Sequence, residues 1–379
     1  MQSATEGKRG TRTSWMSPIR LVLVTVAGLA ALVFAACGGD GDGGGDGDGG
    51  KIAFLLPESQ TTRYEAADRP YFQANVEKLC PDCELFYYNA DQDIPTQQQQ
   101  VETAITEDVD VMVLDPVDSA SAAGLATRAK DAGIPVVSYD RLILDADLDY
   151  YASFDSVTVG EQQGESLSKK LQQEGSPQGP IVVINGDPQD NNAKLFNQGA
   201  TSVFDKEGVE IAREFDTPDW LPENAQREMD QAITALGKDG FAAVYAANDG
   251  TAGGAIAALK GAGIDPATKP TTGQDAELAA IQRIIAGEQF MTVYKPIKTL
   301  AENAAAIAVP VANGDEVPSD LINAEEDNGT EQVPTNRIDT IPVSTAKQIE
   351  DSVIADDYWS IEEICTKQYQ QACKDAGIQ

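Results

Sequence analysis

The chain has 379 residues, and its 61 Asp and Glu outnumber its 27 Lys and Arg, which gives a formal net charge of −34. A surface this acidic repels nucleic acid and anionic lipid headgroups and disfavours an anionic ligand, but it leaves a neutral ligand unaffected. Histidine is absent. This excludes Ser-His-Asp and Cys-His nucleophiles and histidine-bound metals, whereas catalysis by carboxylates or lysine stays open.

The first 36 residues have the pattern of an export signal. The basic side chains near its start are Lys8, Arg9, Arg12 and Arg20. Residues 19–36 are almost wholly apolar, and Cys37 follows two alanines. This arrangement resembles a bacterial lipobox, with Phe34 where leucine is usual. A transmembrane anchor is the alternative, because the run is nearly long enough to span a bilayer. We expect residues 1–36 to be a lipoprotein signal peptide and a lipid on Cys37 to hold the chain, extracytoplasmic or periplasmic, at the membrane.

Residues 37–50 contain almost only Gly and Asp after the cysteine. A run of this composition cannot offset the entropy of ordering, so it predicts a flexible tether. It is not a phosphate-binding loop, since no strand precedes it and no lysine closes it.

Beyond residue 50, short apolar runs alternate with helical patterns. The predicted strands are 51–56, 84–89, 110–114, 134–139, 150–154, 180–184, 209–215, 242–246, 270–273 and 289–294. The helical patterns include 119–132, 159–173, 224–236 and 251–262. Near-continuous apolar strands separated by helices indicate parallel sheets that are covered on both faces. The pattern restarts near Pro180. The sequence therefore predicts an α/β protein with two doubly wound parallel-sheet lobes.

Polar residues follow many of these strands. They are Asp115, Asp140-Arg141, residues 185–192, Asn248-Asp249 and Gln274-Asp275. Open α/β sheets bind ligands outside the carboxyl ends of their strands, so we expect one site shared by two facing lobes. Helix capping is the alternative for about half of these residues, Asp115 included.

Four cysteines remain after Cys37, and export favours their oxidation to disulfides. Cys80 and Cys83 close a helical stretch, so a structural clip is expected rather than a redox motif. We expect local pairing, Cys80 with Cys83 and Cys365 with Cys373. Positions eight apart on one straight helix lie about 12 Å apart, beyond disulfide reach. Either the helix that carries Cys365 and Cys373 is interrupted, or each of these cysteines pairs with Cys80 or Cys83 instead.

Six motifs between residues 51 and 353 resemble the periplasmic xylose-binding proteins of the type I solute-binding superfamily. They cover 138–151, 190–196, 220–225, 248–256, 273–278 and 291–296. The resemblance implies two lobes joined by a three-segment hinge. The implied N-terminal lobe is 51–156 with 293–335, and the implied C-terminal lobe is 157–292 with 336–379. The cysteine-bearing tail lies outside the resemblance.

The resemblance also implies which residues contact the sugar. They are Arg63, Tyr64, Asp140, Arg141, Asn192, Trp220, Asn248, Asp275 and Lys295. Tyr64 is a departure, since the family has tryptophan there. Amides, carboxylates and arginine can pair with hydroxyls, and aromatic rings can cover the C–H faces of a pyranose. The charged members are costly to bury unpaired, so they should pair with one another. The alternatives are a core aromatic for Trp220 and surface salt bridges for Arg141 and Lys295.

The leading hypothesis is a monomeric, non-catalytic binding protein that closes on D-xylose and delivers it to an ABC permease, with no cofactor or metal. A binder of glucose, galactose or several sugars is the alternative within the same fold. A glycosidase would need two carboxylates, and Asp140 with Asp275 could supply them. Nothing in the sequence raises the pKa of either acid recognisably, which disfavours that reading.

Overall fold

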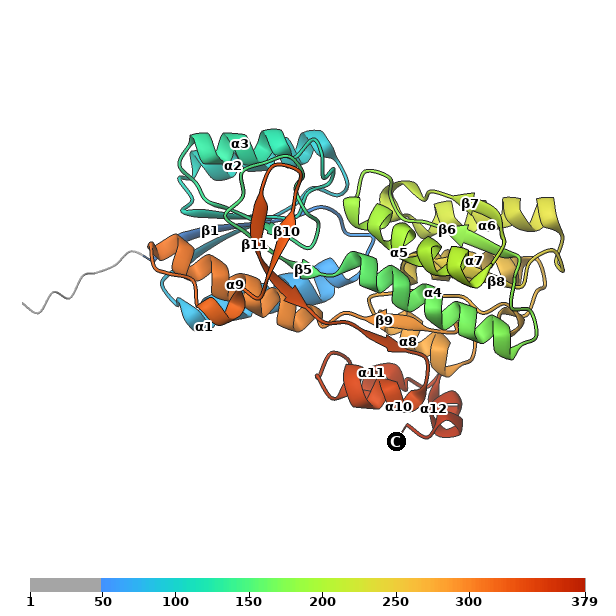
Figure 1. Ribbon diagram of the computed structural model, residues 1–379. Helices are drawn as coiled ribbons and strands as arrows, with labels where there is room; N and C mark the ends of the chain where they lie inside the picture. The colour runs from blue at the N-terminus through green and yellow to red at the C-terminus, as the bar shows by residue number, and fades with distance from the viewer. Residues whose placement is uncertain (1–48, 379) are drawn as a thin grey trace, which may run out of the picture. The chain divides into compact units, whose positions relative to one another are not determined.

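The computed structural model describes residues 49–378, which form two α/β lobes (Figure 1). The first lobe contains a seven-stranded sheet of order β10-β11-β5-β4-β3-β1-β2. Its strands are β1 (Lys51–Leu56), β2 (Glu84–Asn89), β3 (Val111–Leu114), β4 (Val136–Tyr139), β5 (Tyr150–Phe154), β10 (Ala324–Asp327) and β11 (Gln332–Ile338). All neighbouring strands are parallel except β10 and β11.

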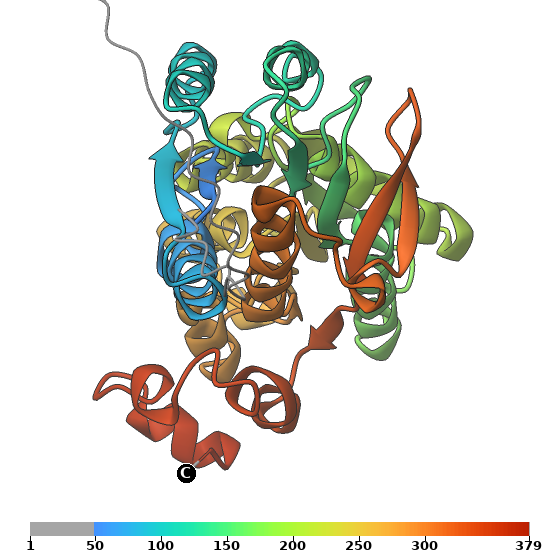
Figure 2. The same ribbon diagram turned by 90° about the vertical axis from the view of Figure 1, so that its left-hand side faces the viewer.

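Helices cover both faces of the central part of this sheet, because strands such as β1 and β3 are apolar on both sides. Ile52, Phe54 and Leu56 of β1 belong to one core, while Ala53 and Leu55 belong to another. Figure 2 looks along the lobe and shows helices on either side of the strands. The first core lies under α1 (Arg69–Leu79) and α9 (Ile297–Asn313), and the second lies under α2 (Ile94–Thr106) and α3 (Ala123–Asp131). The continuous apolar strands thus produce the layered lobe that the sequence predicted.

The second lobe repeats this plan on a three-stranded parallel sheet of order β7-β6-β8. Its strands are β6 (Ile181–Ile184), β7 (Ile211–Phe215) and β8 (Ala243–Ala246). One face packs on α4 (Ser156–Gln173) and α5 (Asn191–Glu207), and the other on α6 (Pro222–Leu236) and α7 (Asp249–Gly261). The predicted α/β class with two doubly wound lobes is therefore confirmed.

The strand predicted at 270–273 is wrong, since it is reduced to an isolated bridge between Val244 and Thr271. Thr272 explains why. Its hydroxyl accepts a hydrogen bond from the Ala246 N–H at 2.9 Å and donates to the Ala246 carbonyl at 3.0 Å. The Thr272 side chain therefore bonds the Ala246 N–H and carbonyl, which a neighbouring strand would otherwise pair with through its backbone.

The chain passes between the lobes in three places. These are the junction of β5 with α4, the turn from β9 (Thr292–Tyr294) to α9, and the stretch from β11 to β12 (Ile341–Val343). Strand β12 pairs antiparallel with β9. The lobe boundaries at 156, 292 and 335 stay a prediction, and the pairing of β11 with β5 continues to Ile338.

The C-terminal segment adds α10 (Ala346–Ile349), α11 (Ile361–Ile364) and α12 (Gln370–Ala376), which lie near α8 (Leu278–Ile285) (Figure 1). Cys365 and Cys373 form a disulfide with their Cα atoms 5.9 Å apart. The pair comes within reach because the chain leaves its helix after Ile364 and re-enters one at Gln370. Cys80 and Cys83 form the other disulfide expected, just beyond the end of α1.

The N-terminal predictions fall mostly outside the described residues. The signal peptide at 1–36 and the lipid site Cys37 lie wholly outside them. Gly50, the last residue of the predicted tether, is buried, and its N–H donates to Asn313 Oδ1 at 3.2 Å. No helix within residues 49–378 is both long and apolar enough to cross a membrane.

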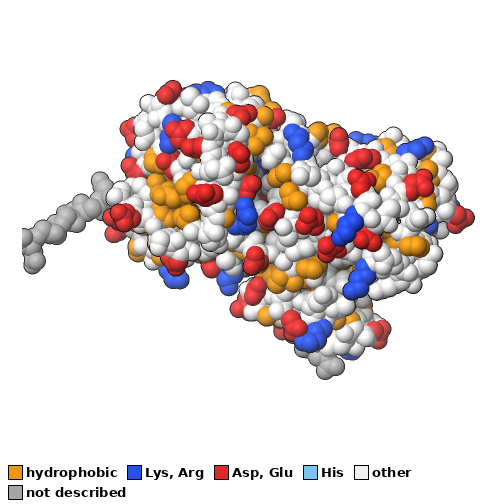
Figure 3. Space-filling model, in the orientation of Figure 1, with side chains coloured by type: hydrophobic (Ala, Val, Ile, Leu, Met, Phe, Trp, Pro, Cys, Tyr) orange, Lys and Arg blue, Asp and Glu red, His pale blue; other side chains and the backbone are white. Residues whose placement is uncertain are grey.

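Acidic side chains are spread over the face shown in Figure 3 rather than gathered in one patch. A dispersed negative charge of this kind keeps an exposed protein soluble without forming a cation-binding surface. Within residues 49–378, no group of three or more Cys, Asp and Glu side chains is arranged to hold a metal ion.

Candidate functional site

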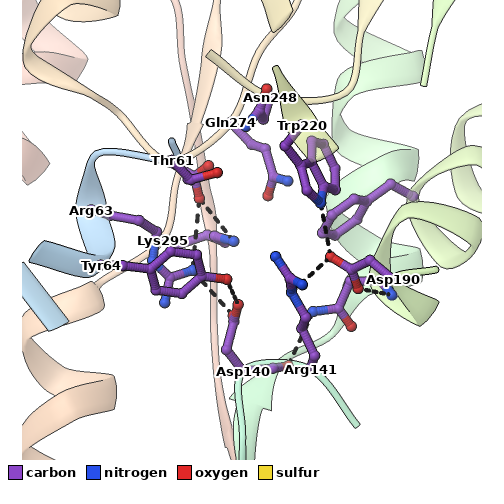
Figure 4. A pocket seen from close by; sticks show the side chains of 13 residues that line it. Thr61, Arg63, Tyr64, Asp140, Arg141, Asp190, Trp220, Asn248, Gln274 and Lys295 are labelled. Atoms are coloured by element: carbon purple, nitrogen blue, oxygen red, sulfur yellow. Dashed lines mark hydrogen bonds and ion pairs between the residues drawn. The ribbon is translucent and has the colours of Figure 1, made fainter. Parts of the chain in front are cut away.

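One polar pocket lies between the carboxyl ends of strands from both lobes (Figure 4). It is lined by Thr61, Arg63, Tyr64, Asp140, Arg141, Asp190, Asn192, Phe196, Trp220, Asn248, Gln274, Asp275 and Lys295. All nine predicted site residues are in this set, although they are spread over more than two hundred positions of sequence. The space that no atom fills is about 270 Å³. That figure includes open solvent, so it is an upper limit and leaves room for no more than one small ligand.

Asp140 enters the pocket on a strained turn directly after β4. Its φ is 53°, a left-handed conformation that is costly for a residue with a Cβ. Its carbonyl accepts hydrogen bonds from Tyr151 Oη at 2.9 Å, Ser153 Oγ at 2.6 Å and Asn192 Nδ2 at 3.0 Å. Asn192 belongs to the other lobe, so one of the three bonds that hold this turn crosses the cleft.

The Arg63 guanidinium holds the Asp140 carboxylate from the other side. It forms a two-pronged pair with Asp68, at 2.9 Å from Nε and 2.6 Å from Nη2, and its Nη1 lies 3.1 Å from Asp140 Oδ1. The Tyr64 hydroxyl donates to Asp140 Oδ2. Burial alone would raise the pKa of Asp140, but Arg63, Lys295 and Arg141 and the Tyr64 hydrogen bond lower it to about 2. Asp140 is therefore ionised at neutral pH and cannot serve as a general acid.

The two other cations of the pocket are also paired with acids. Arg141 Nε lies 3.0 Å from Asp190 Oδ2, and Lys295 Nζ lies 2.8 Å from Asp275 Oδ1. Both cations are buried, so the alternative of a surface salt bridge is wrong. Since each cation is already neutralised, the pocket offers little net positive charge to an anionic ligand, and a neutral polar ligand suits it better.

Carboxylates beneath the pocket are buried deeply. Burial raises the pKa of Glu58, Asp115 and Asp190, although Arg141 opposes the shift in each. Capping does not explain Asp115, because α3 begins after Ala122 and neither Asp115 carboxylate oxygen has a hydrogen-bond partner within residues 49–378. Asp115 Oδ1 instead lies 3.7 Å from Arg141 Nε, so its role is to balance that cation.

Two aromatic side chains stand on opposite sides of the cavity. Figure 4 shows Tyr64 on the first lobe and Trp220 on the second, with the open space between them. Trp220 has φ 54°, and its indole Nε1 donates to Asp190 Oδ2 at 3.2 Å. A Cβ on Gly186 would lie 1.9 Å from the Trp220 ring, so only glycine lets the indole lie there. Trp220 belongs to the core of its lobe, as the alternative interpretation holds, and it also lines the pocket, while its contact with a sugar stays a prediction.

The remaining side chains present polar groups to the space between the rings. Asn248 caps α7, since its Oδ1 accepts the Thr251 N–H at 2.8 Å. Gln274 Oε1 is buried and accepts no hydrogen bond from any residue in 49–378. A cavity with apolar faces and a polar rim matches a compact ligand with hydroxyl groups around an apolar ring.

Four lining residues were absent from the expected sugar contacts, namely Thr61, Asp190, Phe196 and Gln274, although Asp190 and Gln274 were among the polar residues expected at strand ends. Phe196 lies four residues after Asn192 on α5 and therefore on the same helix face. Gln274 directly precedes Asp275, and Asp190 is the N-cap of α5. These spacings could have indicated three of the four, whereas no local pattern singles out Thr61.

Comparisons with known proteins agree with this geometry. The model of the periplasmic binding protein domain family matches residues 52–316. The D-xylose-binding periplasmic protein of Escherichia coli is 39% identical over 312 residues, which is 81% of this chain and 90% of that protein. The multiple sugar-binding periplasmic receptor ChvE of Rhizobium radiobacter is 34% identical over 67% of this chain and 76% of its own length.

A solved structure resembles the fold throughout. It is an ABC transporter solute binding protein from Clostridium phytofermentans with bound β-D-glucose, 28% identical, with a TM-score of 0.74. The match covers 83% of this chain and 99% of that one.

Proposed function

The chain belongs to the periplasmic binding protein family, a family of non-catalytic transport components, and on that premise we propose that it captures D-xylose between its lobes for delivery to an ABC importer. The observation that carries the proposal is the pocket itself, in which nine residues carried over from xylose-binding motifs line one cavity. Its residue types fit a neutral sugar.

The charge pairing supports a sugar over other small ligands. Arg63, Arg141 and Lys295 each lie within 4 Å of a carboxylate. A carboxylate or phosphate ligand would have to displace one of these buried acids, whereas a hydroxyl can share them as donor and acceptor at once. Tyr64 and Trp220 would then cover the ring carbons.

The relatives favour xylose and keep a second candidate in view. Two proteins named for D-xylose binding, from Escherichia coli and Haemophilus influenzae, are 39% and 38% identical over most of this chain. A binder of glucose or of several sugars is the second candidate, because ChvE is named for multiple sugars and the Clostridium phytofermentans structure contains glucose. The family has tryptophan at the position of Tyr64. This residue is therefore the one through which the sugar preference of this chain would differ from that of its xylose-binding relatives.

Capture requires the lobes to open and close about the three crossings. We place the N-terminal lobe at 51–156 with 293–335 and the C-terminal lobe at 157–292 with 336–379, with the last crossing shifted to follow Ile338 because β11 pairs with β5 to that residue. The Asn192 bond to the Asp140 carbonyl and the pair of Arg141 with Asp190 join the two lobes at the site. Closure would therefore assemble the pocket and exclude water from the sugar. A monomer is sufficient for this mechanism.

Calorimetric titration with xylose, glucose, galactose, ribose and arabinose tests the proposal. Xylose should bind with a dissociation constant in the micromolar range or below and at least tenfold more tightly than the other four. Equal affinity for glucose would favour the second candidate. If none of the five binds at micromolar concentration, the sugar-binding proposal is overturned.

We also propose that Cys37 carries a lipid that keeps the protein at the membrane surface. The support is the sequence alone, an apolar run ending in two alanines before the cysteine. Mass spectrometry of the mature N-terminus should find an acylated Cys37, and Cys37→Ala should release the protein from the membrane fraction. An unmodified N-terminus elsewhere in the chain would contradict the anchor.

A further inference from the structure

The backbone at Asp275 and Ala276 is strained. Asp275 has φ 95° and Ala276 has φ 50°, so two consecutive residues with a Cβ occupy the left-handed region. Such conformations persist only where surrounding groups hold them, and they gather at binding sites. Asp275 lines the pocket and pairs with Lys295, so the strain lies directly at the site.

Three hydrogen bonds reach the backbone groups of these two residues, and the Glu277 N–H, in the same peptide plane as the Ala276 carbonyl, also donates to Asp249 Oδ2 at 3.0 Å. The Asp275 N–H donates to the Val293 carbonyl at 2.9 Å, and the Ala276 N–H donates to Thr292 Oγ1 at 3.1 Å. Both partners belong to β9, which leads directly into Lys295. The third bond comes from a distant part of the chain, since Trp359 Nε1 donates to the Ala276 carbonyl at 2.8 Å.

Trp359 belongs to the C-terminal segment, residues 346–378, which lies beyond the 52–316 range of the family match. Its ring packs against that of Tyr358, with the centroids 5.0 Å apart. Gln282 Nε2 of α8 donates to the carbonyls of Glu363 at 3.0 Å and Ile364 at 3.3 Å. The Tyr294 hydroxyl donates to Asp356 Oδ2 at 3.0 Å. The Cys365–Cys373 disulfide closes the segment on itself, and Cys373 is buried in the core.

The C-terminal segment therefore bonds to one sequence neighbour of each member of the Lys295–Asp275 ion pair. Tyr294 precedes Lys295, Ala276 follows Asp275, and both are bonded to the C-terminal segment by residues that do not line the pocket. In Figure 1, α10, α11 and α12 lie beside α8 and β9, at some remove from the sheet of the first lobe.

From this juxtaposition we propose that Trp359 is a positioning residue that holds the Asp275–Ala276 backbone and so fixes the Asp275 carboxylate for the sugar. The proposal rests on the proposed function, since it assigns a role to the C-terminal segment in the same site. Trp359 lines no part of the pocket and acts only through Asp275.

The test compares two conservative changes on adjacent rings. Trp359→Phe removes the indole N–H that bonds Ala276. Tyr358→Phe is the matched control, because the Tyr358 hydroxyl is buried without a hydrogen-bond partner among residues 49–378. In xylose titrations, W359F should weaken binding about fivefold, while Y358F should stay within twofold of the parent. Equal affinities for the two variants would overturn the proposal.

A double substitution distinguishes positioning from general loss of structure. In an Asp275→Asn background, W359F should have little further effect on affinity, because the group it positions is already altered. An equal fivefold loss in that background would show that Trp359 acts elsewhere. A separate variant keeps Asp275 and combines W359F with Ala276→Gly, since glycine adopts positive φ without strain. Its xylose affinity should return to within twofold of the parent, and failure to do so counts against the proposal.

Folding is checked by melting temperature, and W359Y, which also lacks the indole N–H, serves as the second variant if W359F unfolds. Failure of the proposed function is separable, because a parent protein that binds none of the five sugars refutes that function before any variant is compared.

Discussion

The Tyr64 hydroxyl donates a hydrogen bond to Asp140 Oδ2 at 2.9 Å, so the residue that departs from the family pattern is bonded to a central acid of the pocket. Tyr64 is also near two cations, with the Arg63 guanidinium 5.0 Å and the Arg141 guanidinium 5.9 Å from its ring centroid. Burial raises the pKa of Tyr64 well above its ordinary value, so it stays a neutral donor. Its ring and its hydroxyl therefore act on different parts of the site.

Tyr64→Phe keeps the ring and removes only the bond to Asp140. Because a hydrogen bond to a charged group contributes about 2 kcal/mol, xylose affinity should fall about thirtyfold in calorimetric titration. Tyr88→Phe is the control, since the Tyr88 hydroxyl bonds to no residue in 49–378 and lies outside the pocket. An unchanged affinity for Y64F would mean that Asp140 is fixed well enough by Arg63 alone.

Asp140→Asn should abolish tight sugar binding. The change removes the negative charge that faces Arg63 and the acceptor that Tyr64 uses. Breaking a buried pair leaves an uncompensated charge, so affinity should fall by about a hundredfold or more. Circular dichroism checks that the variant is folded, and a folded D140N that retains parental affinity would refute the role of Asp140.

Asp140 also makes the stability of the folded protein depend on pH in the acid range. The Asp140 pKa is lowered from 3.8 to about 2, so its contribution to stability is complete above about pH 4 and is lost as the pH falls toward 2. The loss amounts to about 2 kcal/mol. Chemical denaturation between pH 2 and pH 5 should show a steeper loss of stability for the parent than for D140N.

Gly186→Ala tests the position of Trp220 without touching the indole. The added Cβ would lie 1.9 Å from the ring, so Trp220 has to move out of its place in the pocket. Sugar affinity should fall at least tenfold, as expected when an aromatic anchor is displaced. Gly261→Ala is the matched control in the same lobe, because a Cβ there meets no atom within 4 Å. Similar affinities for the two variants would contradict the packing argument.

The raised pKa of Glu277 predicts that the stability of the folded protein falls as the pH rises toward neutrality. Burial and then the charge of Asp275 raise its pKa from 4.5 to about 7. Between those values the folded protein holds a proton that the unfolded chain has lost, so the free energy of unfolding falls with rising pH, by about 3 kcal/mol in total. Glu277→Gln removes this proton while keeping an acceptor for the Thr62 N–H, which lies 3.3 Å from Glu277 Oε1.

Denaturation of the parent and E277Q from pH 4.5 to pH 8 measures this contribution. The neighbouring acid that the substitution also affects is Asp249, since the Glu277 charge helps to raise the pKa of Asp249. The variant should gain stability relative to the parent up to about pH 7 and no further above it. A difference that does not change with pH would show that Glu277 keeps an ordinary pKa.

The sequence by itself determined the layered lobes and most of the pocket. Strands such as β3 and β6 are four buried apolar residues long, and continuous apolar runs of that kind are typical of a sheet covered on both faces. Motif matching identified nine lining residues because sugar contacts recur as short patterns at strand ends.

Only the tertiary structure decided how those residues are held. The pairing of Arg63 with Asp140, and the bond from Trp359 to Ala276, join positions 77 and 83 residues apart, and no local pattern encodes such a distance. The left-handed turns at Asp140, Trp220 and Asp275 were equally hidden, since nothing in those residue types requires a positive φ. The hydrophobic periodicity of a sequence indicates which side of a helix or strand is buried. Backbone strain and long-range ion pairs arise only when separate elements pack together.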